Sequence, residues 1–260
     1  GSAKDVCTAV KILLANGFIA LCVVFSGGCR SAPSTNGEQN RRLTLEEFVL
    51  LDWQRQVEYL EQVASRGTSG DDDRIVAYAL TDDDTGVIVK ALEVSHALSL
   101  KEHLPRAEEL LLNNDAIIRW RALLLIEKLH GNEAVLPQVA RLTGDKEWLV
   151  RETAYRVLRT FSSERKKRTY FYTVLFRLNE KNPSVVAEIY RTLVWYDDES
   201  AWPYMIKRSY HCKSASELIL VMRELARTKN REAQVRLKTL TRSQSIIVRQ
   251  EANDLLREYF

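Results

Sequence analysis

The chain has 260 residues, of which 45% are hydrophobic and 28% are charged, and its formal net charge is +3. This composition is that of a folded protein with a substantial core, so it excludes a largely disordered chain, and the small net charge excludes a whole-chain signal for nucleic-acid binding. Only ten Gly and five Pro occur, and no long alternation of β-branched residues, which excludes a sheet protein and predicts an all-α fold.

The N-terminal residues have the pattern of an export signal. Lys4 and Lys11 precede an apolar run from Ile12 to Phe25, which leads into Ser26-Gly27-Gly28-Cys29. An ordinary membrane span needs about 20 residues, whereas this shorter run has the length of a signal-peptide core. We therefore expect residues 1–28 to be a signal peptide.

The same stretch resembles a bacterial lipoprotein signal, in which the cysteine after the small residues is acylated and becomes the first residue of the mature protein. The resemblance implies that Cys29 carries a lipid and anchors the chain on the periplasmic side of the inner or outer membrane. Residues 29–43 are polar without a hydrophobic period and are predicted to be a flexible tether. Gly1-Ser2-Ala3 is interpreted as a cloning remnant. The alternative is that residues 12–25 form a buried helix or a short span and that the cysteine is an ordinary thiol.

Residues 44–260 contain a repeated phrase. Val150-Arg151-x-x-Ala154-x-x-x-Leu158 recurs as Val248-Arg249-x-x-Ala252-x-x-x-Leu256. Weaker copies give the anchors Val87, Ile118, Val150, Val186, Leu218 and Val248, separated by 31, 32, 36, 32 and 30 residues. Such a period is typical of a solenoid, in which each helix pair buries its apolar face only against its neighbours.

In each unit the phrase is predicted to open the second helix, because the anchor and the residues four and eight places later form one stripe of a helix. Ser95 and Tyr190 fit this apolar, closely packed stripe poorly. First helices are predicted over 73–80, 101–112, 133–142, 164–178, 200–210 and 231–241. A further helix over 44–65 begins with the capping-box pattern Thr44-x-x-Glu47 and is expected to cover the open end. The predicted fold is an α-solenoid of about six antiparallel helix pairs plus this N-terminal capping helix.

Asp115 before Arg119 and Asp145 before Arg151 complete a resemblance to HEAT-type repeats of the short bacterial form, over roughly residues 71–260. The resemblance implies a right-handed superhelix of antiparallel helix pairs whose second helices line the concave side. It also implies that the Asp and Arg side chains form a structural ladder between neighbouring units.

Six aromatic residues crowd into residues 190–210, and Trp and Tyr are preferred anchors of protein interfaces. The candidate partner-binding residues are Trp195, Tyr196, Trp202 and Tyr204, of which the first two are favoured. The alternative is that most of these rings fill the core of the solenoid.

The basic run Arg165, Lys166, Lys167 and Arg168 is a second candidate binding site. It opens a predicted first helix, where cations oppose the helix dipole, so folding does not require it there. An acidic partner or anionic lipid headgroups would explain it, and the alternative is a solvated edge.

The two ends of the solenoid differ in charge. Eleven acidic residues face three arginines between Glu46 and Asp84, whereas twelve Lys and Arg face six acidic residues from Ala201 onward. Self-association through the acidic N-terminal and basic C-terminal ends is therefore one possibility, and ordinary solvated surface is the other.

No catalytic pattern is found in the sequence. The four histidines lack metal-ligand spacing, and His-Glu-x-x-His, a glycine-rich phosphate loop and Gly-x-Ser-x-Gly do not occur. We therefore expect no catalytic residue, no metal and no cofactor.

The sequence thus predicts a membrane-anchored lipoprotein of the cell envelope whose HEAT-like solenoid acts as a non-catalytic scaffold. Its expected partners are one or more envelope proteins, with the membrane bound through the lipid and no nucleic acid bound. The alternative is a HEAT-like enzyme that acts on nucleic acid, in the manner of a DNA glycosylase, or on a tetrapyrrole, in the manner of a bilin lyase.

Overall fold

The computed structural model describes residues 41–161 and 163–260, so the predicted signal peptide, Cys29 and most of the predicted tether lie outside the described residues. Every regular element in the described part is helical. The α-helices are α1 (Leu45–Val49), α2 (Trp53–Arg66), α3 (Asp72–Ala79), α4 (Thr85–Leu98), α5 (Leu104–Leu110), α6 (Ala116–Leu129), α7 (Leu136–Leu142), α8 (Trp148–Phe161), α9 (Glu164–Leu175), α10 (Pro183–Tyr196), α11 (Trp202–Ser209), α12 (Ala215–Arg227), α13 (Arg231–Leu240) and α14 (Ile246–Tyr259).

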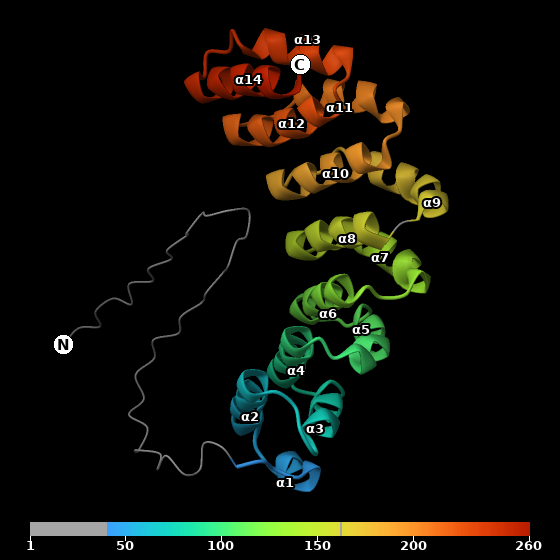
Figure 1. The fold of residues 1–260 in the computed structure, drawn as a ribbon, viewed down its shortest axis with the longest axis vertical. Coiled ribbons are helices and arrows are strands. Elements are labelled where there is room, and N and C mark those ends of the chain that lie inside the picture. The colour runs from blue at the N-terminus through green and yellow to red at the C-terminus, as the bar shows by residue number, and fades with distance from the viewer. Residues whose placement is uncertain (1–40, 162) are drawn as a thin grey trace, which may run out of the picture. The chain divides into compact units, whose positions relative to one another are not determined.

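The helices of residues 42–260 pack in consecutive pairs to form an α-solenoid, as predicted (Figure 1). Each even-numbered helix from α4 to α14 contacts its own first helix, and consecutive even-numbered helices contact one another from α2 to α14. The odd-numbered helices lie on the other side and mostly contact only their own partners. The even-numbered helices are therefore the continuous, closely packed layer of the stack, which corresponds to the predicted second helices.

The N-terminal end differs from the single capping helix predicted over 44–65. The capping box is present, since Thr44 N donates to Glu47 at 2.9 Å and Glu47 N donates to Thr44 Oγ1 at 3.3 Å. However, the chain turns after α1, and Asp52 accepts from the backbone of Arg55 at 3.0 Å and caps a new helix, α2. Helix α2 packs on α4 as the other second helices pack on one another. Helices α1 and α2 therefore count as a further pair, and the described solenoid has seven pairs.

Short polar side chains set where the second helices begin. An Asp, Asn or Ser at the N-cap accepts a hydrogen bond from a backbone N–H of the first turn, which otherwise lacks a partner. The caps of α4, α6, α10 and α12 are Asp84, Asp115, Asn182 and Ser214. The aspartate before the repeated phrase thus has a local structural role as the N-cap of the second helix.

The repeated apolar stripe forms the core. Val150, Ala154 and Leu158 are at most 1% exposed, and the residues at the corresponding positions of the other units are also mostly buried. The two poorly fitting residues are buried as well, and their polar groups are satisfied. Ser95 Oγ donates to the carbonyl of Ala91 at 2.8 Å, and the Tyr190 hydroxyl donates to the carbonyl of Met205 at 2.6 Å.

Ser95 also contacts a buried histidine. Its Oγ lies 2.8 Å from Nδ1 of His103, which is 4% exposed. Burial lowers the pKa of His103, although the carboxylates of Glu102 and Asp73 act in the opposite direction. The folded protein therefore favours the neutral imidazole.

We expect stability to fall as the pH drops below about 6.5. The unfolded chain binds the proton of His103 at the ordinary pKa of about 6.5, whereas the folded protein resists it, so protonation favours unfolding. Urea denaturation at about pH 7.5 and about pH 5.5 measures this loss. The variant His103→Gln should lose less stability over the same interval. An equal loss would assign the effect to another group, such as His96, whose pKa burial also lowers.

Candidate binding groove

Arginine side chains that follow the anchor residue link consecutive units. Arg119 holds Asp145 of the next unit through two contacts of 2.8 Å, and Arg151 holds Glu180 through contacts of 2.7 and 3.0 Å. Nη1 of each arginine also donates to two carbonyl groups of the turn before its own helix. The ladder implied by the HEAT resemblance is thus present at these two junctions, with a glutamate in the second.

The arginines keep these largely buried carboxylates charged. Burial alone would raise the pKa of Asp145 and of Glu180, but hydrogen bonds from the arginines and from backbone N–H groups outweigh it, so both pKa values are lowered. Their oxygens accept hydrogen bonds from the arginines. These residues therefore stabilise the junctions and offer little to a partner.

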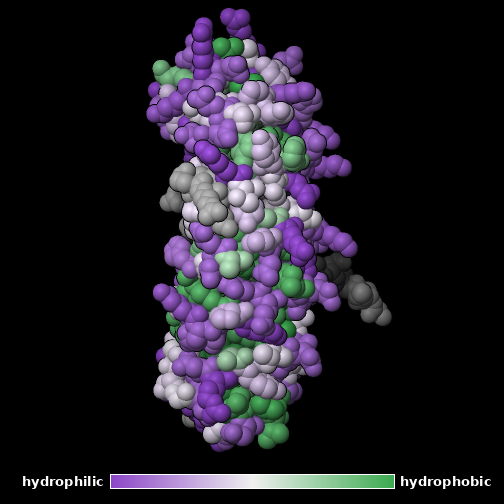
Figure 2. Space-filling model, turned by 90° about the vertical axis from the view of Figure 1, so that its right-hand side faces the viewer, coloured by the Kyte–Doolittle hydropathy of each residue, from purple (hydrophilic) through white to green (hydrophobic). Residues whose placement is uncertain are grey.

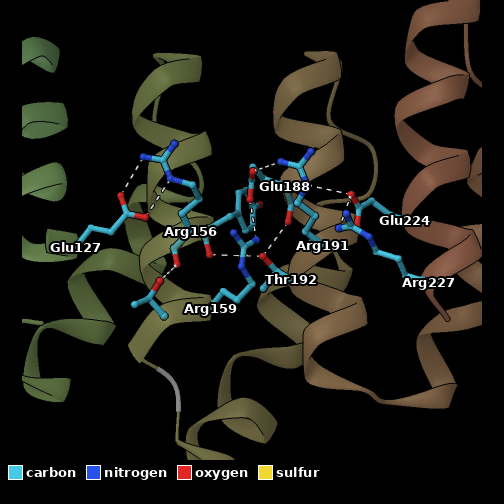
Figure 3. A network of polar contacts seen from close by, with 10 residues as sticks. Glu127, Arg156, Arg159, Glu188, Arg191, Thr192, Glu224 and Arg227 are labelled. Carbon is cyan, nitrogen blue, oxygen red and sulfur yellow. Dashed lines mark hydrogen bonds and ion pairs between the residues drawn. The ribbon is translucent and has the colours of Figure 1, made fainter. Parts of the chain in front are cut away.

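A second ladder runs along the even-numbered helices (Figure 3). Glu188 is 2% exposed and binds both Arg159, at 2.7 Å, and Arg191. Arg191 continues to Glu224 at 2.9 Å, which also binds Arg227 at 2.9 Å. A buried carboxylate is tolerated only when it is paired and hydrogen-bonded, so these arginines have a structural role.

Further pairs extend the second ladder in both directions. They are Lys90–Glu61, Arg121–Glu93, Arg156–Glu127 and Arg223–Glu251. Cations and anions alternate along this layer. In the part of the chain that the structure describes, the second helices therefore present paired charges and not the basic stripe that favours nucleic acid.

The first ladder does not continue from α10; the anchors Val87 and Leu218 also lack a following arginine and have Ile88 and Ile219 there. The anchor Val186 is followed by Ala187, so no arginine at this position reaches from α10 to the next junction. A groove of about 600 Å³ lies there, between the C-terminal end of α9, α11 and the first turn of α12. Its apolar surface includes Phe176 and Tyr204, which are 75% and 57% exposed. Large exposed rings beside a concave surface are typical of a binding site.

Arg208 forms one side of the groove. It donates to the carbonyl of Leu178 at 3.0 Å and to Glu217 at 2.7 Å, which ties α11 to the turn before α10 and to α12. Its Nη1 is buried and has no acceptor among the described residues. Arg208 therefore fixes the wall of the groove, and its buried Nη1 is not accessible to a partner.

The four predicted aromatic residues do not form one exposed cluster. Tyr196 and Trp202 are 7% and 5% exposed, so they belong to the core and not to a contact surface. Trp195 is 38% exposed and lies against the ring of Tyr196, with 5.7 Å between the ring centroids. Tyr204 is the one of the four that lines the groove.

The predicted basic run also lies apart from the groove. Residues 165–168 belong to the first turns of α9, whereas the groove is at the C-terminal end of that helix. Arg168 is exposed, and the side chains of Arg165, Lys166 and Lys167 lie outside the described part. At 1.5 Å per residue, Arg168 and Phe176 are separated by roughly 12 Å along the helix axis.

Sequence reasoning missed the residues that line the groove from α9. Phe176, at the C-terminal end of α9, lines the groove, and its exposed ring stacks on that of the neighbouring exposed residue Tyr172 with 5.9 Å between centroids. One signal in the sequence points to this place, the 36-residue step between Val150 and Val186. The alanine after Val186 does not single it out, because Ile88 and Ile219 replace the arginine in two other units. Figure 2 shows the face formed by the first helices, where hydrophobic side chains lie scattered among hydrophilic ones.

No family model and no curated protein matches the chain. Among solved structures, an engineered protein is similar to this chain with 14% identity and a TM-score of 0.53. The match covers 83% of this chain and 66% of the engineered protein, so the chain spans less than two thirds of that protein's length. A designed armadillo repeat protein has 14% identity and a TM-score of 0.47 over 71% of this chain and 98% of its own. The complex of CpcE and CpcF of phycocyanin lyase from Nostoc sp. PCC7120 has 13% identity and a TM-score of 0.48, over 90% of this chain and 100% of the matched chain. At such identities a likeness concerns the fold alone, and the assignment of an α-solenoid rests on the packing of the helix pairs.

Two further observations concern the described residues only. None of their helices is long and apolar enough to cross a membrane. They contain no group of three or more His, Cys, Asp or Glu side chains arranged to hold a metal ion.

Replacing Arg151 by Ala should lower the free energy of unfolding by about 2–3 kcal/mol, because the carboxylate of Glu180 and two turn carbonyls lose their donor in a partly buried junction. The matched control is Arg257→Ala, since this side chain is 78% exposed and pairs only with Asp254 nearby. The control should change stability by less than about 0.5 kcal/mol. Urea denaturation compares the two, and equal losses would contradict the structural role of the ladder.

Proposed function

We propose that the protein is a non-catalytic scaffold that binds another protein through the groove between α9, α11 and α12. The observation that carries the proposal is the pair of exposed rings, Phe176 and Tyr204, that line one groove at a junction between units. Aromatic residues at the centre of a contact surface contribute most to protein binding, because they bury a large area with few rotatable bonds.

The charge pattern of the second helices supports a protein partner over nucleic acid. Nucleic-acid binding depends on neutralising phosphates with unpaired Lys and Arg. Along the second helices, however, the arginines are engaged by glutamates such as Glu188 and Glu224. The exposed basic and aromatic groups around the groove are better suited to a local contact with a protein.

We further propose that a lipid on Cys29 holds this scaffold at the periplasmic side of a bacterial membrane. The support is the sequence alone: Ile12–Phe25 has the length of a signal-peptide core and is followed by small residues and the cysteine. One acyl chain binds a membrane only marginally, so stable anchoring requires the multiple acylation that such a signal directs.

The anchor is tested by Cys29→Ala. Membrane fractionation should show the variant in an unprocessed form, and mass spectrometry should detect the acylated cysteine only in the parent protein. The control is Cys212→Ala, since this half-buried thiol of the solenoid should have no influence on processing. Unchanged processing and membrane retention of the first variant would contradict the lipid anchor.

The partner site is tested by a photo-crosslinking side chain at position 204 in intact cells. We expect a defined crosslinked protein, because Tyr204 is exposed on the groove. The control is the same side chain at Trp53, which is 53% exposed on α2 at the other end of the stack. A crosslink to a second copy of the chain would indicate self-association. Equal crosslinking at both positions, or none at position 204, would refute binding through the groove.

A further inference from the structure

We infer that the groove binds an acidic linear segment of the partner, in which carboxylate side chains flank an aromatic or aliphatic residue. The inference rests on the proposed function and specifies the chemistry that the groove recognises. It is carried by three properties of the groove: the state of its own acidic residues, its unpaired cations and its apolar surface.

Both acidic residues of the groove are already neutralised. Glu180 receives two contacts from Arg151, at 2.7 and 3.0 Å, and two more from backbone N–H groups, at 2.8 and 2.9 Å. The carboxylate of Glu217 accepts hydrogen bonds from Arg208 at 2.7 Å and from the backbone N–H of Lys213 at 2.8 Å. Neither carboxylate is therefore available to neutralise a further cation in the groove.

Three lysines line the same groove. Lys181, Lys207 and Lys213 are exposed, and none forms an ion pair with any of the described residues. The imidazole of His211 is also exposed there, with Nδ1 3.0 Å from the carbonyl of Lys207. The unpaired charge of the groove is therefore positive and is complementary to carboxylates.

The apolar surface adds a second requirement. Leu175 and Leu178 are each 8% exposed and lie beside the exposed rings of Phe176 and Tyr204. An anion alone would leave these rings in water, whereas an apolar side chain would cover them.

A peptide fits this combination better than a polynucleotide. Three lysines clustered around one groove, with paired charges along the second helices, provide few phosphate contacts, and nucleic-acid affinity grows with their number. A chain segment in extended conformation can instead place alternate side chains on the lysines and on the rings.

The test measures binding of a labelled synthetic peptide to the purified full chain by fluorescence anisotropy. In the probe, Glu and Asp flank a central Phe-Leu pair. We expect binding that weakens as salt rises, since exposed charges are screened. Lys207→Glu and Tyr204→Ala should each weaken it about tenfold or more, which corresponds to roughly 1.4 kcal/mol. The matched controls are Lys238→Glu and Trp53→Ala, which are exposed on α13 and α2 and should leave binding unchanged.

Three other probes decide the chemistry. A peptide with Lys in place of the acidic residues and one with Ser in place of Phe-Leu should both bind at least about tenfold more weakly. A single-stranded oligonucleotide should not displace the acidic peptide at comparable concentration. The inference is overturned if either altered peptide binds equally well, if the oligonucleotide competes fully, or if Lys207→Glu has no effect.

Failure of the inference and failure of the proposed function have different signatures. If position 204 crosslinks to a partner in cells but the crosslinked segment found by mass spectrometry is not acidic, the scaffold function stands and the inference fails. If position 204 gives no crosslink at all, the proposed function through this groove fails as well.

Discussion

Packing between consecutive second helices is the interaction on which the rest of the structure depends. Each unit supplies an apolar stripe such as Val150, Ala154 and Leu158, and a small middle residue lets neighbouring helices approach closely. No unit encloses a core of its own, so burial is achieved only in the stack. The groove follows from this architecture, because it lies at a junction between units and is lined by residues from both.

Polar residues decide how the junctions differ. Where an arginine follows the anchor, as in Arg119 and Arg151, it closes the junction by binding the acidic residue of the next turn and two local carbonyls. Where Ala187 replaces it, the junction is spanned from α11 by Arg208, and the groove lies beside this contact. The same repeat thus produces two junctions closed by the first ladder and, beside Arg208, a junction with exposed aromatic and basic groups.

Much of the fold could be predicted because helical periodicity and N-caps are local. The second helices begin where the repeated phrase placed them, and the capping box at Thr44 is present. The break in the predicted helix over 44–65 was missed, because the N-cap role of Asp52 competes with an otherwise helical pattern. The sequence could not show how Ser95 and Tyr190 are accommodated in the stripe, since their partners, His103 and the carbonyl of Met205, come from other helices.

The candidate site was less predictable, because it too depends on contacts between residues of different helices. The sequence by itself determined the repeat, the all-α class, the helix starts and the pattern of a lipoprotein signal, because these depend on neighbouring residues and on spacing. Only the tertiary structure decided that Trp202 is buried while Tyr204 is exposed, and that Phe176 lines the same groove as Tyr204. Exposure depends on which helix face meets the next unit, and that is set by the stack as a whole and not by any one segment.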